Sequence, residues 1–141
     1  MIRDADDADL DGLALILGQW CRDTPWLPKL HTAQEDRWFL GELFRLSTLR
    51  VVGRPALGFL ARHGADVDAL YLAPEARRKG LGRALIHDAM AAEPVLRLWA
   101  FEANREARAF YAVLGFVEVG RTEGDNDEGL PDIRLEWRRN V

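Results

Sequence analysis

The 141-residue chain has little of what marks several large classes of protein. Cys21 is its only cysteine, so no disulfide can form within the chain and cysteines alone cannot build a metal site. No stretch of about eighteen apolar residues could span a membrane, and Met1–Asp4 lacks the apolar character of a signal peptide. We therefore expect a soluble, cytoplasmic protein without a membrane partner.

Charge and ligand spacing exclude further classes. The formal net charge is −4, from 19 basic and 23 acidic residues, so nucleic-acid binding is not expected. No cluster of His, Cys, Asp or Glu has the spacing of metal ligands, and no serine-centred nucleophile motif occurs. No metal is predicted, and His63 and His87 suggest no function. The length fits a single domain over residues 1–141.

What the chain does have is a change of hydrophobic period that predicts an α/β fold. Helices are expected from residue 10 to about Pro25 and over 32–43, where Thr32 would be the cap and Trp38, Phe39 and Leu43 would form the apolar side. A hairpin follows, so the sheet should be mixed rather than wholly parallel. The expected strands are 46–52, 56–62, 67–72, 95–101, 116–119 and 133–137, and the later helices are 81–92 and 105–114.

A phosphate site is predicted in residues 77–82, the phosphate loop, where the third of these strands gives way to a helix. Gly80 and Gly82 allow a tight turn that brings backbone N–H groups to a ligand, at a helix N-terminus whose dipole favours negative charge. A helix start beside a solvated basic stretch would look the same, but neither a P-loop nor a dinucleotide fingerprint fits. No acid occurs over 76–86, an interval that contains Arg77, Arg78, Lys79 and Arg83.

Two sequence blocks resemble the GNAT acetyltransferase superfamily. The first is Arg-x-x-Gly-x-Gly in the phosphate loop, after a strand that ends in Leu-Tyr-Leu-x-Pro-Glu. The second runs from Trp99-x-Phe101-x-x-Asn104 through Phe110-Tyr111 to Gly115-Phe116. The blocks span residues 66–119, over a third of the chain, in the family's order. The resemblance implies an α/β fold with a mixed, mostly antiparallel central sheet, flanking helices and the order β-α-α-β-β-β-α-β-α-β-β.

The resemblance also implies acetyl-coenzyme A as cosubstrate and gives roles to single positions. Backbone N–H groups of the phosphate loop would hold the pyrophosphate, and main-chain groups of Leu70 and Leu72 would meet the thioester carbonyl and the pantetheine arm. Arg78 stands where many relatives have glycine. This difference should matter little, because backbone N–H groups would bind the pyrophosphate. The implied cofactor-binding residues are Leu70, Leu72, Arg77, Arg78, Lys79, Gly80, Leu81, Gly82, Arg83, Asn104 and Tyr111.

Acetyl transfer to an amine needs an oxyanion donor, an acid for the leaving thiolate and a base for the amine. The N–H of Leu70 is the expected donor, and Tyr111 is the expected acid unless it only packs in the core. Asp66 and Asp68 stand at i and i+2 of the strand that carries Leu70 and Leu72, so all four should share one face. Asp68 is the preferred base, although both carboxylates could be solvated edge-strand acids.

Three aromatic or basic side chains are expected near the acceptor. The segment between the first two helices holds Trp26 and ends in His31, and in the GNAT fold this connection overhangs the acceptor site. His31 could act as the base, or it could be a surface or helix-capping residue. Trp99 could wall the pocket or belong to the core.

A bacterial GNAT subgroup combines a similar segment with an acidic loop and a closing strand, matched here by residues 126–128 and 131–137. Glu128 in that loop would suit a cationic acceptor, unless the loop is only a solvated turn. We therefore expect an N-acetyltransferase of a small-molecule amine that reacts by direct attack in a ternary complex. A protein or peptide N-acetyltransferase and a non-catalytic acyl-CoA-binding module are the alternatives, and a homodimer is left open because dimers are frequent in the superfamily.

Overall fold

The structure is a computed structural model that describes residues 1–140. In this part of the chain seven strands form one sheet, in the order β1-β2-β3-β4-β5-β7-β6. The strands are β1 (Ile2–Asp4), β2 (Thr48–Val52), β3 (Gly58–His63), β4 (Asp66–Leu72), β5 (Val95–Phe101), β6 (Val117–Thr122) and β7 (Asp132–Arg138). The helices are α1 (Leu10–Arg22), α2 (Ala33–Leu46), α3 (Leu81–Ala92) and α4 (Arg105–Val113), with 3-10 turns η1 (Asp7–Asp9) and η2 (Pro74–Ala76).

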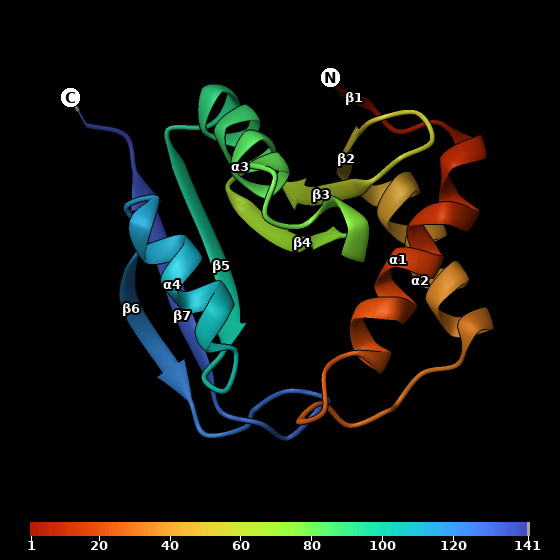
Figure 1. Cartoon of the computed structure of the whole chain (residues 1–141). Helices are drawn as coiled ribbons and strands as arrows, with labels where there is room; N and C mark the ends of the chain where they lie inside the picture. Colours follow the sequence, from red (N-terminus) through yellow and green to blue (C-terminus); the bar gives the residue numbers. More distant parts are fainter. Residues whose placement is uncertain (141) are drawn as a thin grey trace.

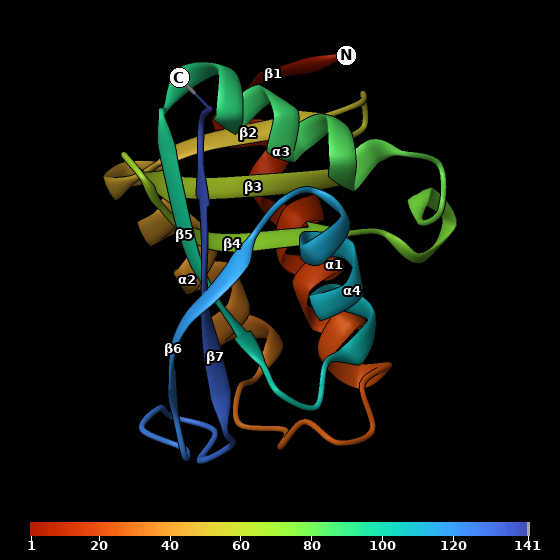
Figure 2. The same cartoon turned by 90° about the vertical axis from the view of Figure 1, so that its left-hand side faces the viewer.

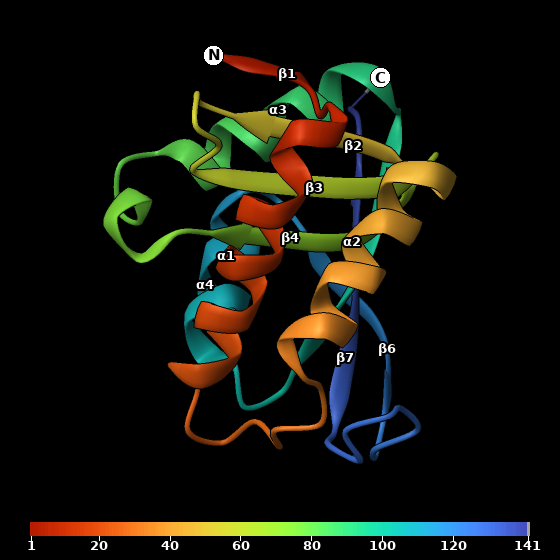
Figure 3. The ribbon, with the colours of Figure 1, turned by 90° about the vertical axis from the view of Figure 1, so that its right-hand side faces the viewer.

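The sheet and the order of elements confirm the expected fold class. Neighbouring strands are antiparallel except β4 and β5, which are parallel. Figure 1 shows the whole chain, with α3 and α4 on one face of the sheet, in front in Figure 2. Figure 3, from the opposite side, shows α1 and α2 in front of β2, β3 and β4. No helix within residues 1–140 is both long and apolar enough to cross a membrane.

One buried cluster lies on each face of the sheet. On the α1 side, Leu13 and Leu40 pack with Phe59 of β3, and all three are fully buried. On the other side, Leu85 of α3 packs with Leu96 of β5. Each such side chain contributes about 1.5–3 kcal/mol when it leaves water, so these clusters hold the helices to the sheet.

Helix α2 begins with the expected capping box, and of the three residues expected on its apolar side only Leu43 is buried. Trp38 is 67% exposed and Phe39 is 37% exposed, so the expectation is wrong for these two. The buried positions are Asp36, Leu40 and Leu43, because α1 packs along that stripe. When both sides of a helix carry apolar residues, the hydrophobic period alone does not predict which side packs against another helix, here α1.

Strand β4 contains a β-bulge at its centre. Arg62 of β3 pairs with Val67, whereas the adjacent Ala61 pairs with Ala69, so Asp68 is an extra residue in β4. A bulge leaves its extra residue out of the ladder and changes the direction of the side chains around it.

This bulge overturns the alternation expected from the sequence. Without it, Asp66 and Asp68 would share one face with Leu70 and Leu72. Val67 and Leu70 instead pack in the same buried cluster although they are three residues apart, which a regular strand would not allow. The expectation of one shared face is therefore wrong.

Candidate active site

Strands β4 and β5 separate soon after they meet. Asp66 and Arg97 form the ladder pair between them, and the N–H of Arg97 donates to the carbonyl of Ala65 at 2.8 Å. No further ladder pair joins the two strands in residues 1–140. The main chain of β4 between Asp68 and Leu72 therefore has no partner strand on its β5 side.

A pocket of about 760 Å³ lies where the strands diverge, within the size range of small-molecule sites. Its walls come from β4, the phosphate loop, the first turn of α3, β5 and α4. It is also lined by Trp20, Tyr71 and Phe101, which were given no site role from the sequence. The predicted site residues that line it are Asp68, Leu70, Leu72, Arg77, Arg78, Gly80, Leu81, Gly82, Arg83, Trp99, Asn104 and Tyr111.

The phosphate loop turns sharply into α3. Gly80 is the N-cap residue, with φ 79°, and a Cβ added to it would meet nothing within 4 Å. The first N–H groups of α3 have no partner within the helix and are therefore available to a ligand. Arg78 also adopts a left-handed backbone, with φ 63°. This conformation costs a non-glycine residue roughly 1–2 kcal/mol, so Arg78 affects stability whatever its effect on binding.

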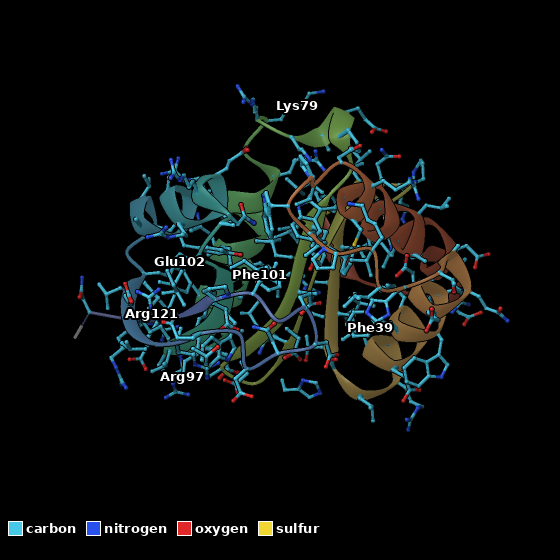
Figure 4. The ribbon with its side chains drawn as sticks, turned by 90° about the horizontal axis from the view of Figure 1, so that it is seen from below. Phe39, Lys79, Arg97, Phe101, Glu102 and Arg121 are labelled. Carbon is cyan, nitrogen blue, oxygen red and sulfur yellow. The ribbon has the colours of Figure 1, made fainter. Side chains whose placement is uncertain are left out.

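The basic side chains of the loop differ in position. Arg77 lines the pocket, and its Nη2 is buried without a hydrogen-bond partner within residues 1–140. Such a donor is costly to leave unpaired. Lys79 does not line the pocket, and Figure 4 shows it at the outer end of the loop, well away from Phe101.

Two tyrosines line the pocket, Tyr111 from α4 and Tyr71 from β4. Burial raises the pKa of both phenols well above the usual range, so each hydroxyl keeps its proton at neutral pH. Tyr111 also packs against Phe110 and Phe116, with ring centroids 5.1 and 5.3 Å apart. It is thus both a core residue and a possible proton donor.

Asn104 stands at the start of α4. Its Oδ1 accepts a hydrogen bond from the N–H of Ala107 at 3.1 Å, which makes it the N-cap of the helix. Because the oxygen is used in this way, the amide nitrogen is the group that can reach a ligand in the pocket.

The carboxylates of β4 have different partners. Oδ2 of Asp68 lies 2.5 Å from Nδ1 of His63, at the end of β3. No role was expected for His63, and an acid five residues away across a predicted hairpin is the signal that could have identified it. Asp66 does not line the pocket; it forms an ion pair with Arg134 at 3.1 Å. The Arg134 guanidinium lies over the Trp99 ring, 5.2 Å from its centroid, so Asp66 helps to hold the pocket wall.

Trp26 lies behind the pocket wall rather than in it. Its ring contacts Trp20 and Phe101, with centroids 6.3 and 5.6 Å away, and both of these line the pocket. The α1–α2 connection thereby joins α1 to β5. His31, at the end of this connection, is exposed and does not line the pocket.

Glu128 lies in the β6–β7 connection, which Figures 1 and 3 show near the α1–α2 connection. Burial raises the pKa of Tyr71, and the negative charge of Glu128 adds to the effect. Glu128 does not line the pocket. Within residues 1–140, no group of three or more His, Cys, Asp or Glu is arranged to hold a metal ion.

Known protein families and curated proteins include relatives of this chain. Residues 44–118, more than half of the chain, match the family described as Acetyltransferase (GNAT) domain. Over 75 residues the chain is 39% identical to peptidyl-lysine N-acetyltransferase YjaB of Escherichia coli, a match to 53% of this chain and 50% of YjaB. The match thus spans about half the length of that relative. Peptidyl-lysine N-acetyltransferase YiaC of Escherichia coli is 27% identical over 97% of this chain and 96% of YiaC.

Two solved structures have the same fold. The solution structure of apo-form YjaB from Escherichia coli is 30% identical, with a TM-score of 0.73 and coverage of 99% of this chain and 98% of that one. The structure of yncA from Salmonella typhimurium with its cofactor acetyl-CoA is 16% identical and has a TM-score of 0.77. The match covers 100% of this chain and 94% of that one. At 16% identity the likeness shows the fold alone.

The fold and the matched family model together define the class of domain as a GNAT acetyltransferase domain. The chain belongs to the GNAT acetyltransferase family, as its two sequence blocks indicated.

Proposed function

We propose that the protein transfers the acetyl group of acetyl-CoA to a primary amine by direct attack in a ternary complex. The observation that carries the proposal is the pocket, where the open side of β4, the start of α3 and the Tyr111 hydroxyl meet. One pocket thus offers backbone donors, anion-binding groups and a protonated acid.

The residues present fit acetyl-CoA. The buried, unpaired Nη2 of Arg77 and the open N-terminus of α3 behind Gly80 suit the phosphates. Main-chain groups of Leu70 and Leu72, together with the Asn104 amide, suit the pantetheine arm and the thioester. Acetyl-CoA supplies the thioester that the amine attacks.

The chain's own groups would promote this attack in three ways. The N–H of Leu70 would stabilise the oxyanion, an effect worth about 3 kcal/mol in comparable sites. Tyr111, whose hydroxyl stays protonated because burial raises its pKa, would donate to the leaving thiolate. Asp68, which lines the pocket, would accept the proton of the amine.

We propose a lysine side chain of a protein or peptide as the first acceptor class to test. YjaB and YiaC both carry the name peptidyl-lysine N-acetyltransferase, and this supports a protein acceptor over the small molecule expected from the sequence. The negative charge of Glu128 near Tyr71 also suits a cationic acceptor. A small-molecule amine remains the second candidate.

The test measures thiol release from acetyl-CoA with two acceptor panels, alongside calorimetry of acetyl-CoA binding. The panels are lysine peptides with blocked N-termini and small primary amines. We expect saturable turnover with lysine peptides. Faster turnover of small amines would show that the acceptor is a small molecule instead of a lysine side chain. Acetyl-CoA binding without turnover in either panel would favour the non-catalytic module.

A further inference from the structure

The contact between His63 and Asp68 joins the end of β3 to the bulge of β4. We propose that the two residues form a proton relay, in which Asp68 takes a proton from the acceptor amine and His63 takes it from Asp68. The inference rests on the proposed function and deepens it. Asp68 would be the group that touches the amine, and His63 would be a positioning residue that acts through Asp68.

The pair connects the pocket with solvent. Asp68 lines the pocket, whereas His63 does not. The His63 side chain is 52% exposed, so a proton that reaches it can leave to water. The bulge places Asp68 out of the ladder at this point, and bulges next to active sites commonly redirect a side chain in this way.

Asp68 contacts an imidazole, whereas the nearby carboxylates contact guanidinium groups. Asp66 is paired with Arg134, and the nearby Arg62 donates to the carbonyl of Gly64 and to Glu93, at 3.1 and 3.2 Å. A guanidinium stays charged, so a carboxylate bound to one resists protonation. Asp68 instead faces an imidazole, which can take up and release a proton near neutral pH.

A direct contact between the two groups also suits proton transfer. A proton between Oδ2 and Nδ1 belongs either to a carboxyl O–H that donates to the imidazole or to an imidazolium N–H that donates to the carboxylate. The two states differ only in the position of that proton, so no heavy atom has to move. An imidazole is a stronger base than a carboxylate, so the imidazole is the better final acceptor.

The proton balance of the whole reaction is consistent with this route. The acceptor enters as R–NH3⁺ and loses one proton before it attacks. The C–N bond then forms, the C–S bond breaks, and the nitrogen loses a second proton. One proton ends on the CoA thiol and one leaves to water, so the products are the acetamide, CoA–SH and H⁺. The relay carries the proton that leaves to water.

The first test uses a blocked lysine peptide as the acceptor probe. We expect His63→Gln to lower kcat by at least 10-fold while the Kd of acetyl-CoA stays the same, because glutamine can hydrogen-bond to Asp68 but cannot take its proton. His87→Gln, on exposed α3, is the matched control and should leave kcat unchanged. A His63→Gln variant with wild-type kcat would overturn the relay.

Two further measurements separate proton transfer from a structural role. Imidazole in solution should restore turnover to His63→Ala, whereas pyrazole, a much weaker base of the same size, should not; equal rescue by both would contradict the relay. In a double-mutant cycle, His63→Gln combined with Asp68→Asn should cost no more than Asp68→Asn alone, and additive losses would show independent roles. Absence of wild-type turnover with acetyl-CoA bound would overturn the proposed function, and the relay with it.

Discussion

The two ends of the pocket are built on different principles. The cofactor end, residues 70–83 with the start of α4, consists mainly of backbone groups on one continuous stretch of chain. The proposed amine end consists of the side chains of Trp20, Asp68 and Trp99, from α1, β4 and β5, with His63 of β3 in contact with Asp68. Backbone groups perform their role with many different side chains attached, whereas the amine end depends on each residue it contains.

Among the variants that compare the two ends, Tyr111→Phe should have the largest effect on kcat. It changes a side chain at the cofactor end. Because the phenol is the proposed acid, kcat should fall about 100- to 1000-fold, with the Kd of acetyl-CoA unchanged. Phenylalanine keeps the packing against Phe110 and Phe116, so the unfolding midpoint should not move.

Tyr71→Phe is the matched control, because this second tyrosine also lines the pocket and also has a raised pKa. Its ring packs on the opposite cluster, 5.1 Å from Trp20, and we expect less than a 10-fold change in kcat. A larger loss in Tyr71→Phe than in Tyr111→Phe, measured by steady-state thiol release, would identify Tyr71 as the acid instead of Tyr111.

A smaller effect is expected where the backbone of the cofactor end is packed. A Cβ on Gly58 would lie 2.3 Å from Cδ2 of Leu72 and 3.0 Å from the carbonyl of Tyr71. Gly58→Ala should therefore displace the end of β4, lower the free energy of unfolding by about 1–3 kcal/mol and weaken acetyl-CoA binding. Gly12→Ala, in an open position on α1, should instead raise stability by up to about 1 kcal/mol. Calorimetric unfolding and binding titrations measure both variants.

The same contrast explains what could be predicted from the sequence. Helix α3 and strand β5 were predicted with their observed bounds, 81–92 and 95–101, because each has a clear local period. The phosphate loop was recognisable because its glycines and its helix start are adjacent in the chain. Local patterns therefore predicted the elements that frame the proposed cofactor end.

The amine end was less predictable because it depends on contacts between distant segments. One extra residue, Asp68, changes the direction of the side chains that follow in β4, and nothing in the local sequence marks the bulge. The partner of His63 is visible only when the hairpin register is known. Trp26 was placed at the site, yet the ring that reaches the pocket is its neighbour Trp20.

The smallest predicted effect tests whether the phosphate loop binds by geometry or only by charge. Arg77→Gln removes a buried donor that the phosphates would satisfy, so the Kd of acetyl-CoA should rise about 10-fold. Lys79→Gln removes the same charge from an exposed position outside the pocket, where water and salt screen it, and should change Kd by less than about 3-fold. Titration calorimetry at low and moderate salt measures both variants. Equal losses that vanish as salt is added would mean that the loop acts as a diffuse positive field, and the cofactor end would then depend on its side chains as much as the amine end does.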